Sequence, residues 1–129
     1  MTDTTRALIG EVLGTFLLVL IVVASGIAAE SMSDIFALQL GLHALAVAAG
    51  LAALIVFLGP VSGAHFNPAV TLGFVIERTM HHRAAASYVV AQIGGGIFGA
   101  IVANAMFGLP WIEASTQVRS GADQVVSEF

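Results

Sequence analysis

The chain alternates long apolar runs with short polar connections. The first run, residues 7–29, contains one charged side chain, Glu11. A polar connection over 30–34 precedes a longer run, 35–76, that has no charged side chain, and a third run occupies 84–107. At a rise of about 1.5 Å per residue, helices over such runs are long enough to cross a hydrocarbon core of roughly 30 Å. The pattern therefore predicts an all-α membrane protein.

The middle run is too long for a single span, because as one straight helix it would be about twice the length that a bilayer accommodates. Its chain-breaking residues are Gly59 and Pro60, followed by turn and capping residues over Ser62–Pro68. These residues predict a spanning helix over 35–58 and then a re-entrant segment, 59–76, that ends in a short half-helix. Irregular backbone at membrane depth is tolerated only inside protein or beside a water-filled cavity, so this segment predicts a pore or a binding site.

Composition supports the membrane class and removes several others. Charged residues make up 9% of the chain and hydrophobic residues 58%, whereas a soluble domain has about a quarter charged residues. Four basic residues are too few to form a nucleic-acid-binding surface, and the absence of cysteine excludes a disulfide scaffold. Since no spacing fits a metal site, a phosphate loop or a nucleophile with its base, we expect no enzyme, no metal and no cofactor.

The basic residues predict an orientation. Arg6, Arg78 and Arg83 fall on one side of the predicted topology and Arg119 on the other, so the N-terminus is expected on the cytoplasmic side of the cell membrane. Arg6 followed by an apolar run also allows a secretory signal peptide. Glu11 inside the run and the two later apolar segments favour a spanning helix instead.

Small residues recur within the first and third runs, where they favour close approach of helices. They are Gly10, Gly14, Gly94, Gly95, Gly96 and Gly99.

Asn67 and Pro68 are suited to begin the half-helix, as N-cap and first helical residue. The Asn67 side-chain oxygen can accept from the N–H of Ala69 or Val70, which leaves its NH₂ group to donate outward. The positive end of the helix dipole points the same way and repels cations. An extended backbone before Asn67 is expected to add a ladder of carbonyl acceptors, from Gly63, Ala64, His65 and Phe66. Such a site suits water or a polyol, although Asn-Pro also begins many ordinary buried helices.

Residues 62–71, Ser-Gly-Ala-His-Phe-Asn-Pro-Ala-Val-Thr, resemble the first pore loop of the major intrinsic proteins, the aquaporin and glycerol-facilitator family. Residues 7–16 resemble the opening helix of that family and residues 88–95 its third helix, in the same order and spacing. The resemblance implies that residues 1–129 form one aquaporin-like N-terminal repeat, with three transmembrane helices plus one re-entrant half-helix. Its pore motif is Asn67, Pro68 and Ala69.

The resemblance also implies roles for single residues. Glu11 is expected to brace the pore loop by accepting from its N–H groups, the alternative being a side chain that reaches the interface from a helix end. Gln92 is expected beside the loop, the alternative being an ordinary interhelical hydrogen bond. Independently of the resemblance, His65 is interpreted as a structural hydrogen-bonding residue, the alternatives being a pH sensor or a metal ligand. Val47 falls at the position that narrows the pore, where valine favours glycerol, urea or uncharged metalloid hydroxides as well as water.

These features lead to one functional hypothesis and one alternative. The first is a passive half-channel for water or small uncharged solutes, completed by a separate C-terminal half or by another copy and assembled into a higher homo-oligomer as in the family. The arginine distribution argues against an antiparallel pair of copies. The alternative is a non-conducting, truncated or scaffold-like membrane protein. Residues 125–129 repeat the residue pattern of 8–12, which suggests that the chain ends where a second repeat begins.

Overall fold

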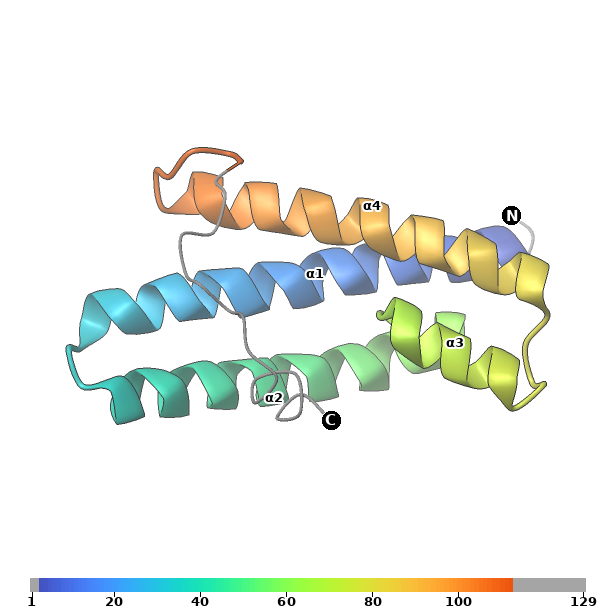
Figure 1. The fold of residues 1–129 in the computed structure, drawn as a ribbon, viewed down its shortest axis with the longest axis horizontal. Helices are drawn as coiled ribbons and strands as arrows, with labels where there is room; N and C mark the ends of the chain where they lie inside the picture. The colour runs from blue at the N-terminus through green and yellow to red at the C-terminus, as the bar shows by residue number, and fades with distance from the viewer. Residues whose placement is uncertain (1–2, 113–129) are drawn as a thin grey trace, which may run out of the picture.

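The structure is a computed structural model in which residues 3–112 are described, and its elements are all helices (Figure 1). They are α1 (Asp3–Met32), α2 (Phe36–Ser62), α3 (Pro68–Ile76) and α4 (His82–Met106). Three of them, α1, α2 and α4, are long and apolar enough to cross a membrane, whereas α3 has nine residues. The predicted class, an all-α membrane protein with three spans and one half-helix, is confirmed.

The first helix is the centre of the bundle. It packs along both α2 and α4, while α3 packs against α4. In Figure 1, α3 lies at the end of the bundle where α1 begins and α2 ends, and the connection between α1 and α2 lies at the opposite end. The half-helix and its loop are therefore confined to one half of the bundle.

The second helix is longer than expected. It continues through Gly59 and Pro60 to Ser62, so the irregular segment is 63–67 and does not begin at residue 59. Pro60 lies in the last helical turn and has no N–H to donate to the carbonyl oxygen of Val56, so the helix loses one backbone hydrogen bond just before it ends. The helix ends at Gly63, whose φ of 88° is left-handed and whose N–H donates to the carbonyl oxygen of Gly59 at 2.9 Å. A glycine in this conformation is a common C-terminal cap, so the stop signal was Gly63.

Glycines bring α1 and α4 into backbone contact. A Cβ atom on Gly95 would lie 2.4 Å from the carbonyl oxygen of Val12, and one on Gly99 would lie 2.5 Å from that of Phe16. Neither side chain fits, because the obstructing atoms belong to the backbone of α1. A Cβ atom on the adjacent Gly94 would meet nothing within 4 Å. Gly95 and Gly99, which lie four positions apart on one face of α4, thus make the expected close approach of the two helices.

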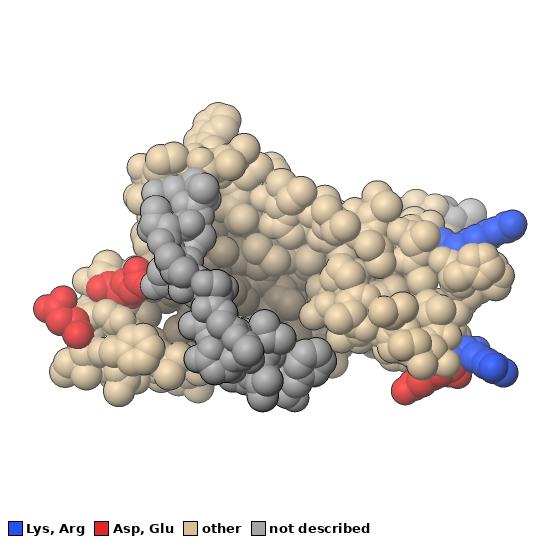
Figure 2. All heavy atoms as spheres, viewed as in Figure 1, with Lys and Arg blue, Asp and Glu red and all other residues tan. Residues whose placement is uncertain are grey.

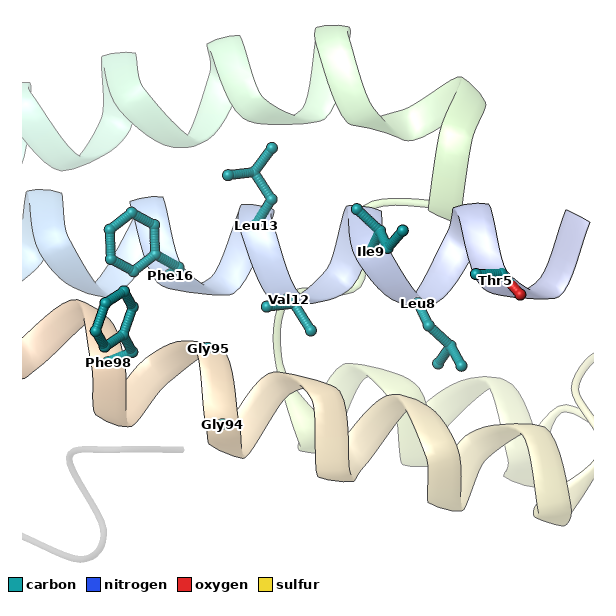
Figure 3. A pocket seen from close by; sticks show the side chains of 9 residues that line it. All are labelled: Thr5, Leu8, Ile9, Val12, Leu13, Phe16, Gly94, Gly95 and Phe98. Atoms are coloured by element: carbon teal, nitrogen blue, oxygen red, sulfur yellow. The ribbon is translucent and has the colours of Figure 1, made fainter. Parts of the chain in front are cut away.

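Beside this contact, α1 and α4 enclose an open apolar groove of about 720 Å³ (Figure 3). The groove is lined by Thr5, Leu8, Ile9, Val12, Leu13, Phe16, Gly94, Gly95 and Phe98. The Phe16 and Phe98 rings stack across it with centroids 5.4 Å apart. Leucine, isoleucine and valine side chains exposed in this way are compatible with a lipid environment.

Apart from the buried Glu11, the charged side chains of the described residues lie at the two ends of the bundle (Figure 2). Glu30 and Asp34 flank the connection between α1 and α2. Asp3 and Glu77 lie at the other end, together with all arginine side chains of the described residues. These arginines are Arg6, Arg78 and Arg83. Arg119 and the pattern at 125–129 lie outside the described residues.

Candidate functional site

A buried carboxylate connects α1 to the loop before α3. The Glu11 side chain has no exposed surface. One of its oxygens accepts from Ser62 Oγ at 2.6 Å and from the His65 N–H at 3.1 Å. The other accepts from the Phe66 N–H at 2.8 Å and from Gln92 Nε2 at 2.7 Å. Two donors on each oxygen offset much of the cost of burying this charge.

The hydrogen-bond network extends from Gln92 into the half-helix. Gln92 Nε2 also donates to Thr71 Oγ1 at 2.9 Å, and the Thr71 hydroxyl donates to the carbonyl oxygen of Asn67 at 3.1 Å. Thr71 Oγ1 lies 3.1 Å from Nδ1 of His65, whose ring stacks on Phe74 with centroids 4.2 Å apart. Since the hydroxyl proton is directed to Asn67, His65 Nδ1 is the donor in this contact. The network therefore holds both sides of the loop.

Two glycines of α1 make room for the end of α2 and for the Phe66 side chain that follows it. Phe66 is 3% exposed, and a Cβ atom on Gly14 would lie 1.9 Å from its ring. A Cβ atom on Gly10 would lie 3.0 Å from Cβ of Ser62. Gly10 thus serves a close contact between α1 and the end of α2, as expected, whereas Gly14 makes room for a residue of the loop and not for a helix.

The loop backbone is not the extended ladder expected from the sequence. Gly63, Ala64 and Phe66 have φ values of 88°, 54° and 49°, which are left-handed. Left-handed conformations of residues other than glycine cost about 1–2 kcal/mol each. Here the turns aim the N–H groups of His65 and Phe66 at Glu11, which offsets that cost. Nothing in the described part of the chain donates a hydrogen bond to the carbonyl groups of 63–66.

Asn67 caps the half-helix. Its Oδ1 accepts from the N–H of Ala69 at 2.8 Å, and Pro68 is the first helical residue. The Asn67 side chain is exposed, and within residues 3–112 its Nδ2 has no hydrogen-bond partner. The structure thus presents an amide donor beside carbonyl acceptors.

Val47 lies apart from this cluster. It is partly buried in the middle of α2, roughly 24 Å along the helix axis from Gly63. One turn before it, His43 Nδ1 lies 2.9 Å from the Ser25 hydroxyl of α1. The loop residues, Glu11 and Gln92 are brought together, whereas Val47 is not.

Three residues of the network were missed by sequence reasoning: Ser62, Thr71 and Tyr88. The Tyr88 hydroxyl donates to the carbonyl oxygen of Ser62 at 2.8 Å. It is the one tyrosine of the chain and precedes Gln92 by four positions, so a helix places both on one face. That spacing was the available signal. Ser62 and Thr71 gave no comparable signal, because hydroxyl groups are common near turns and helix starts.

Two further polar atoms are buried near these contacts without a partner in the described residues, Gln92 Oε1 and Thr15 Oγ1. The same residues hold no group of three or more histidine, aspartate or glutamate side chains able to bind a metal.

Comparison with known proteins agrees with this geometry. The family model for the major intrinsic proteins matches residues 1–128. Aquaglyceroporin AqpS of Rhizobium meliloti is 46% identical over 126 residues, which are 98% of this chain and 54% of that protein. Glycerol uptake facilitator protein-like 6 of Lactiplantibacillus plantarum is 39% identical over 78% of this chain and 41% of its own length. Aquaporin NIP1-2 of Arabidopsis thaliana is 34% identical over 81% of this chain. The chain thus spans about half, or less, of the length of these relatives.

Proposed function

The chain belongs to the major intrinsic protein family, and from that premise we propose that it is one half of a passive transmembrane channel for water and small uncharged solutes such as glycerol. The observation that carries the proposal is the NH₂ group of Asn67, to which no described residue offers an acceptor, at the start of a half-helix in a protein with three candidate membrane spans. It stands beside loop carbonyl groups that no described residue uses. A hydroxyl group both donates and accepts, so this pair of functions suits water and polyols.

In this proposal the loop selects against ions. Asn67 Nδ2 donates to the oxygen of a passing solute, and the carbonyl groups of 63–66 accept from its hydroxyl hydrogens. The positive end of the α3 dipole faces the same place and opposes cations, protons among them. No bond is made or broken, so transport follows the solute gradient and we expect no enzymatic activity.

Glu11 and Gln92 act in the proposal as braces of the pore loop. Their hydrogen bonds hold the N–H groups of His65 and Phe66 and the hydroxyl of Thr71. The loop carbonyl groups are then free to face the solute. This division of labour is supported by the complete burial of Glu11.

A second half completes the pore. The half-helix α3 is roughly 14 Å long, about half of a hydrocarbon core, so a facing element is needed for the other half. The match to about half of an aquaglyceroporin supports the same inference. We propose a separate C-terminal half or a second copy as that element, within a higher homo-oligomer in the cell membrane. The three arginines at one end favour a cytoplasmic N-terminus.

Val47 is proposed as a constriction residue in the middle of α2, roughly 24 Å along the helix axis from Gly63. A valine there leaves a wide, apolar opening, which favours glycerol or urea as well as water.

Osmotic swelling of proteoliposomes tests the proposal. The full chain is reconstituted alone and together with the C-terminal half of an aquaglyceroporin, and water, glycerol and urea are measured separately. Asn67→Asp should reduce permeability at least about tenfold, because a carboxylate loses the NH₂ donor and attracts cations. Asn104→Asp, at the far end of α4, introduces the same charge and should leave permeability unchanged.

Incorporation of each variant is checked by quantitative blotting. Equal permeability of wild type and Asn67→Asp, or none from wild type in either reconstitution, would favour the alternative, a non-conducting membrane protein that keeps the family packing.

A further inference from the structure

The turn between α3 and α4 contains a second candidate site, distant from the pore loop. It is a cavity of about 350 Å³ at the arginine-bearing end of the bundle. The cavity is lined by Val75, Arg78, Thr79, Met80, His81 and His82. The volume falls at the small end of the range of ligand pockets, about 300–1,000 Å³. One guanidinium group and two imidazole rings, and no carboxylate, line it.

The Arg78 guanidinium group has no ion-pair partner in the part of the chain that the structure describes, and its side chain is exposed. Glu77, its neighbour in sequence, and Asp3 are the acidic residues that the structure describes at this end, and neither lines the cavity. Arg6 and Arg83 add positive charge at the same end of the bundle. The local field therefore favours an anion over a cation.

The two histidine rings supply further donors. His81 Nδ1 accepts from the N–H of Arg83 at 3.3 Å as the N-cap of α4. In the neutral ring this contact leaves the proton on Nε2, which is therefore a donor. The His82 ring lies against it with centroids 4.0 Å apart. Side by side, the rings present N–H groups at the positive end of a 25-residue helix.

The backbone of the turn fixes the place of Arg78. Its φ of 60° is left-handed, an uncommon conformation for arginine. The N–H groups of Thr79 and Met80 both donate to the carbonyl oxygen of Phe74, at 3.0 and 3.1 Å. The Thr79 hydroxyl donates to the same carbonyl at 3.0 Å. The turn is thus closed by three hydrogen bonds, and Arg78 is presented from a defined position.

We propose that this cavity binds a phosphate group, with the Arg78 guanidinium as the charged contact and the His81 and His82 rings as hydrogen-bond donors. The planar fork of arginine matches two phosphate oxygens, which makes it well suited to this anion. The cavity lies at an end of the membrane-spanning bundle, next to Ile76, which is 72% exposed. Such a place is reached both by the headgroup of an anionic phospholipid and by free phosphate.

Binding is measured on the full chain in two arms. In the first, the detergent-purified protein is offered phosphatidylglycerol or phosphatidylcholine, and retained lipid is counted by native mass spectrometry. In the second, inorganic phosphate is titrated against sulfate-free buffer of constant ionic strength and followed by ³¹P line broadening. Arg78→Asn is the test variant, because asparagine tolerates the left-handed conformation and the turn keeps its backbone. Arg83→Asn is its matched control, since Arg83 carries the same charge but does not line the cavity.

The Arg78→Asn variant should weaken binding about tenfold or more, as expected for a charge-assisted contact, and Arg83→Asn less than about twofold. If Arg78→Asn weakens the binding of phosphatidylglycerol alone, the ligand is a lipid headgroup. If it weakens the binding of inorganic phosphate, the ligand is free phosphate. Equal weakening by the two variants would overturn the proposal, because it would show diffuse surface charge. Equal retention of phosphatidylglycerol and phosphatidylcholine by wild type, with no phosphate binding, would also overturn it.

Discussion

Two faces on opposite sides of α1 differ completely in chemistry. One face presents Glu11, Gly14 and Thr15, all buried, toward the loop and α4. The other presents Ile9 and Leu13 to the groove of Figure 3, about half exposed. In a membrane, apolar contact between helices gains little over contact with lipid. The comparison teaches that the apolar face allows α1 to insert into the membrane, while the polar face and the glycines determine which parts of the chain pack against it.

The largest effect is expected from removing the carboxylate on the polar face. Glu11→Ala leaves the N–H groups of His65 and Phe66 without an acceptor. An orphaned buried donor costs about 1–3 kcal/mol, so the variant should lose about 2–6 kcal/mol of stability. Unfolding by sodium dodecyl sulfate in mixed micelles measures the loss. Glu30→Ala, an exposed carboxylate at the other end of α1, should change stability by less than about 0.5 kcal/mol.

If the two glutamate variants unfold alike, the polar face does not determine stability and the comparison fails.

A smaller effect is expected where α1 and α4 touch. Gly95→Ala forces a Cβ atom against the Val12 carbonyl oxygen, a backbone atom that cannot rotate away. Overpacking of this kind costs about 1–3 kcal/mol. Gly94→Ala is the matched control, because its Cβ meets open space and alanine favours the helix. Mixed-micelle unfolding should show a destabilised Gly95 variant and an unchanged or slightly stabilised Gly94 variant; the reverse order would contradict the observed register of the two helices.

The glycine pair also shows how far the sequence can be read. Hydrophobic runs longer than a bilayer is thick predict three spans and a half-helix, because length and charge decide insertion. Neither length nor charge decides which glycine of Gly94–Gly96 faces α1. That depends on the rotation of α4 about its axis, which is determined by contacts distant in sequence.

The loop shows the same limit. Asn67 and Pro68 identify the start of α3, since capping is a local property. The left-handed turns at Ala64 and Phe66 are not local, because they depend on hydrogen bonds to Glu11, more than fifty positions away. An extended backbone was the natural expectation without that acceptor. A resemblance to a family identified the partners Glu11 and Gln92, but it gave no backbone angles.

The smallest effect is expected about four turns further along α1, where the same side of the helix meets α2. There, Ser25 and His43 form one part-buried hydrogen bond of 2.9 Å in otherwise apolar surroundings. Interhelical bonds of this kind average about 0.6 kcal/mol in membranes, because the separated helices find other partners. The coupling free energy is measured by a double-mutant cycle with Ser25→Ala and His43→Leu, in which each variant is unfolded in mixed micelles. It should lie near this value. A coupling above about 2 kcal/mol would contradict this expectation. A single polar contact would then contribute as much stability as the variant Glu11→Ala is expected to remove. A coupling near zero would mean that the hydrogen bond between Ser25 and His43 adds no stability, as for the apolar contacts of the groove in Figure 3. Polar contacts would then determine the packing at the loop alone.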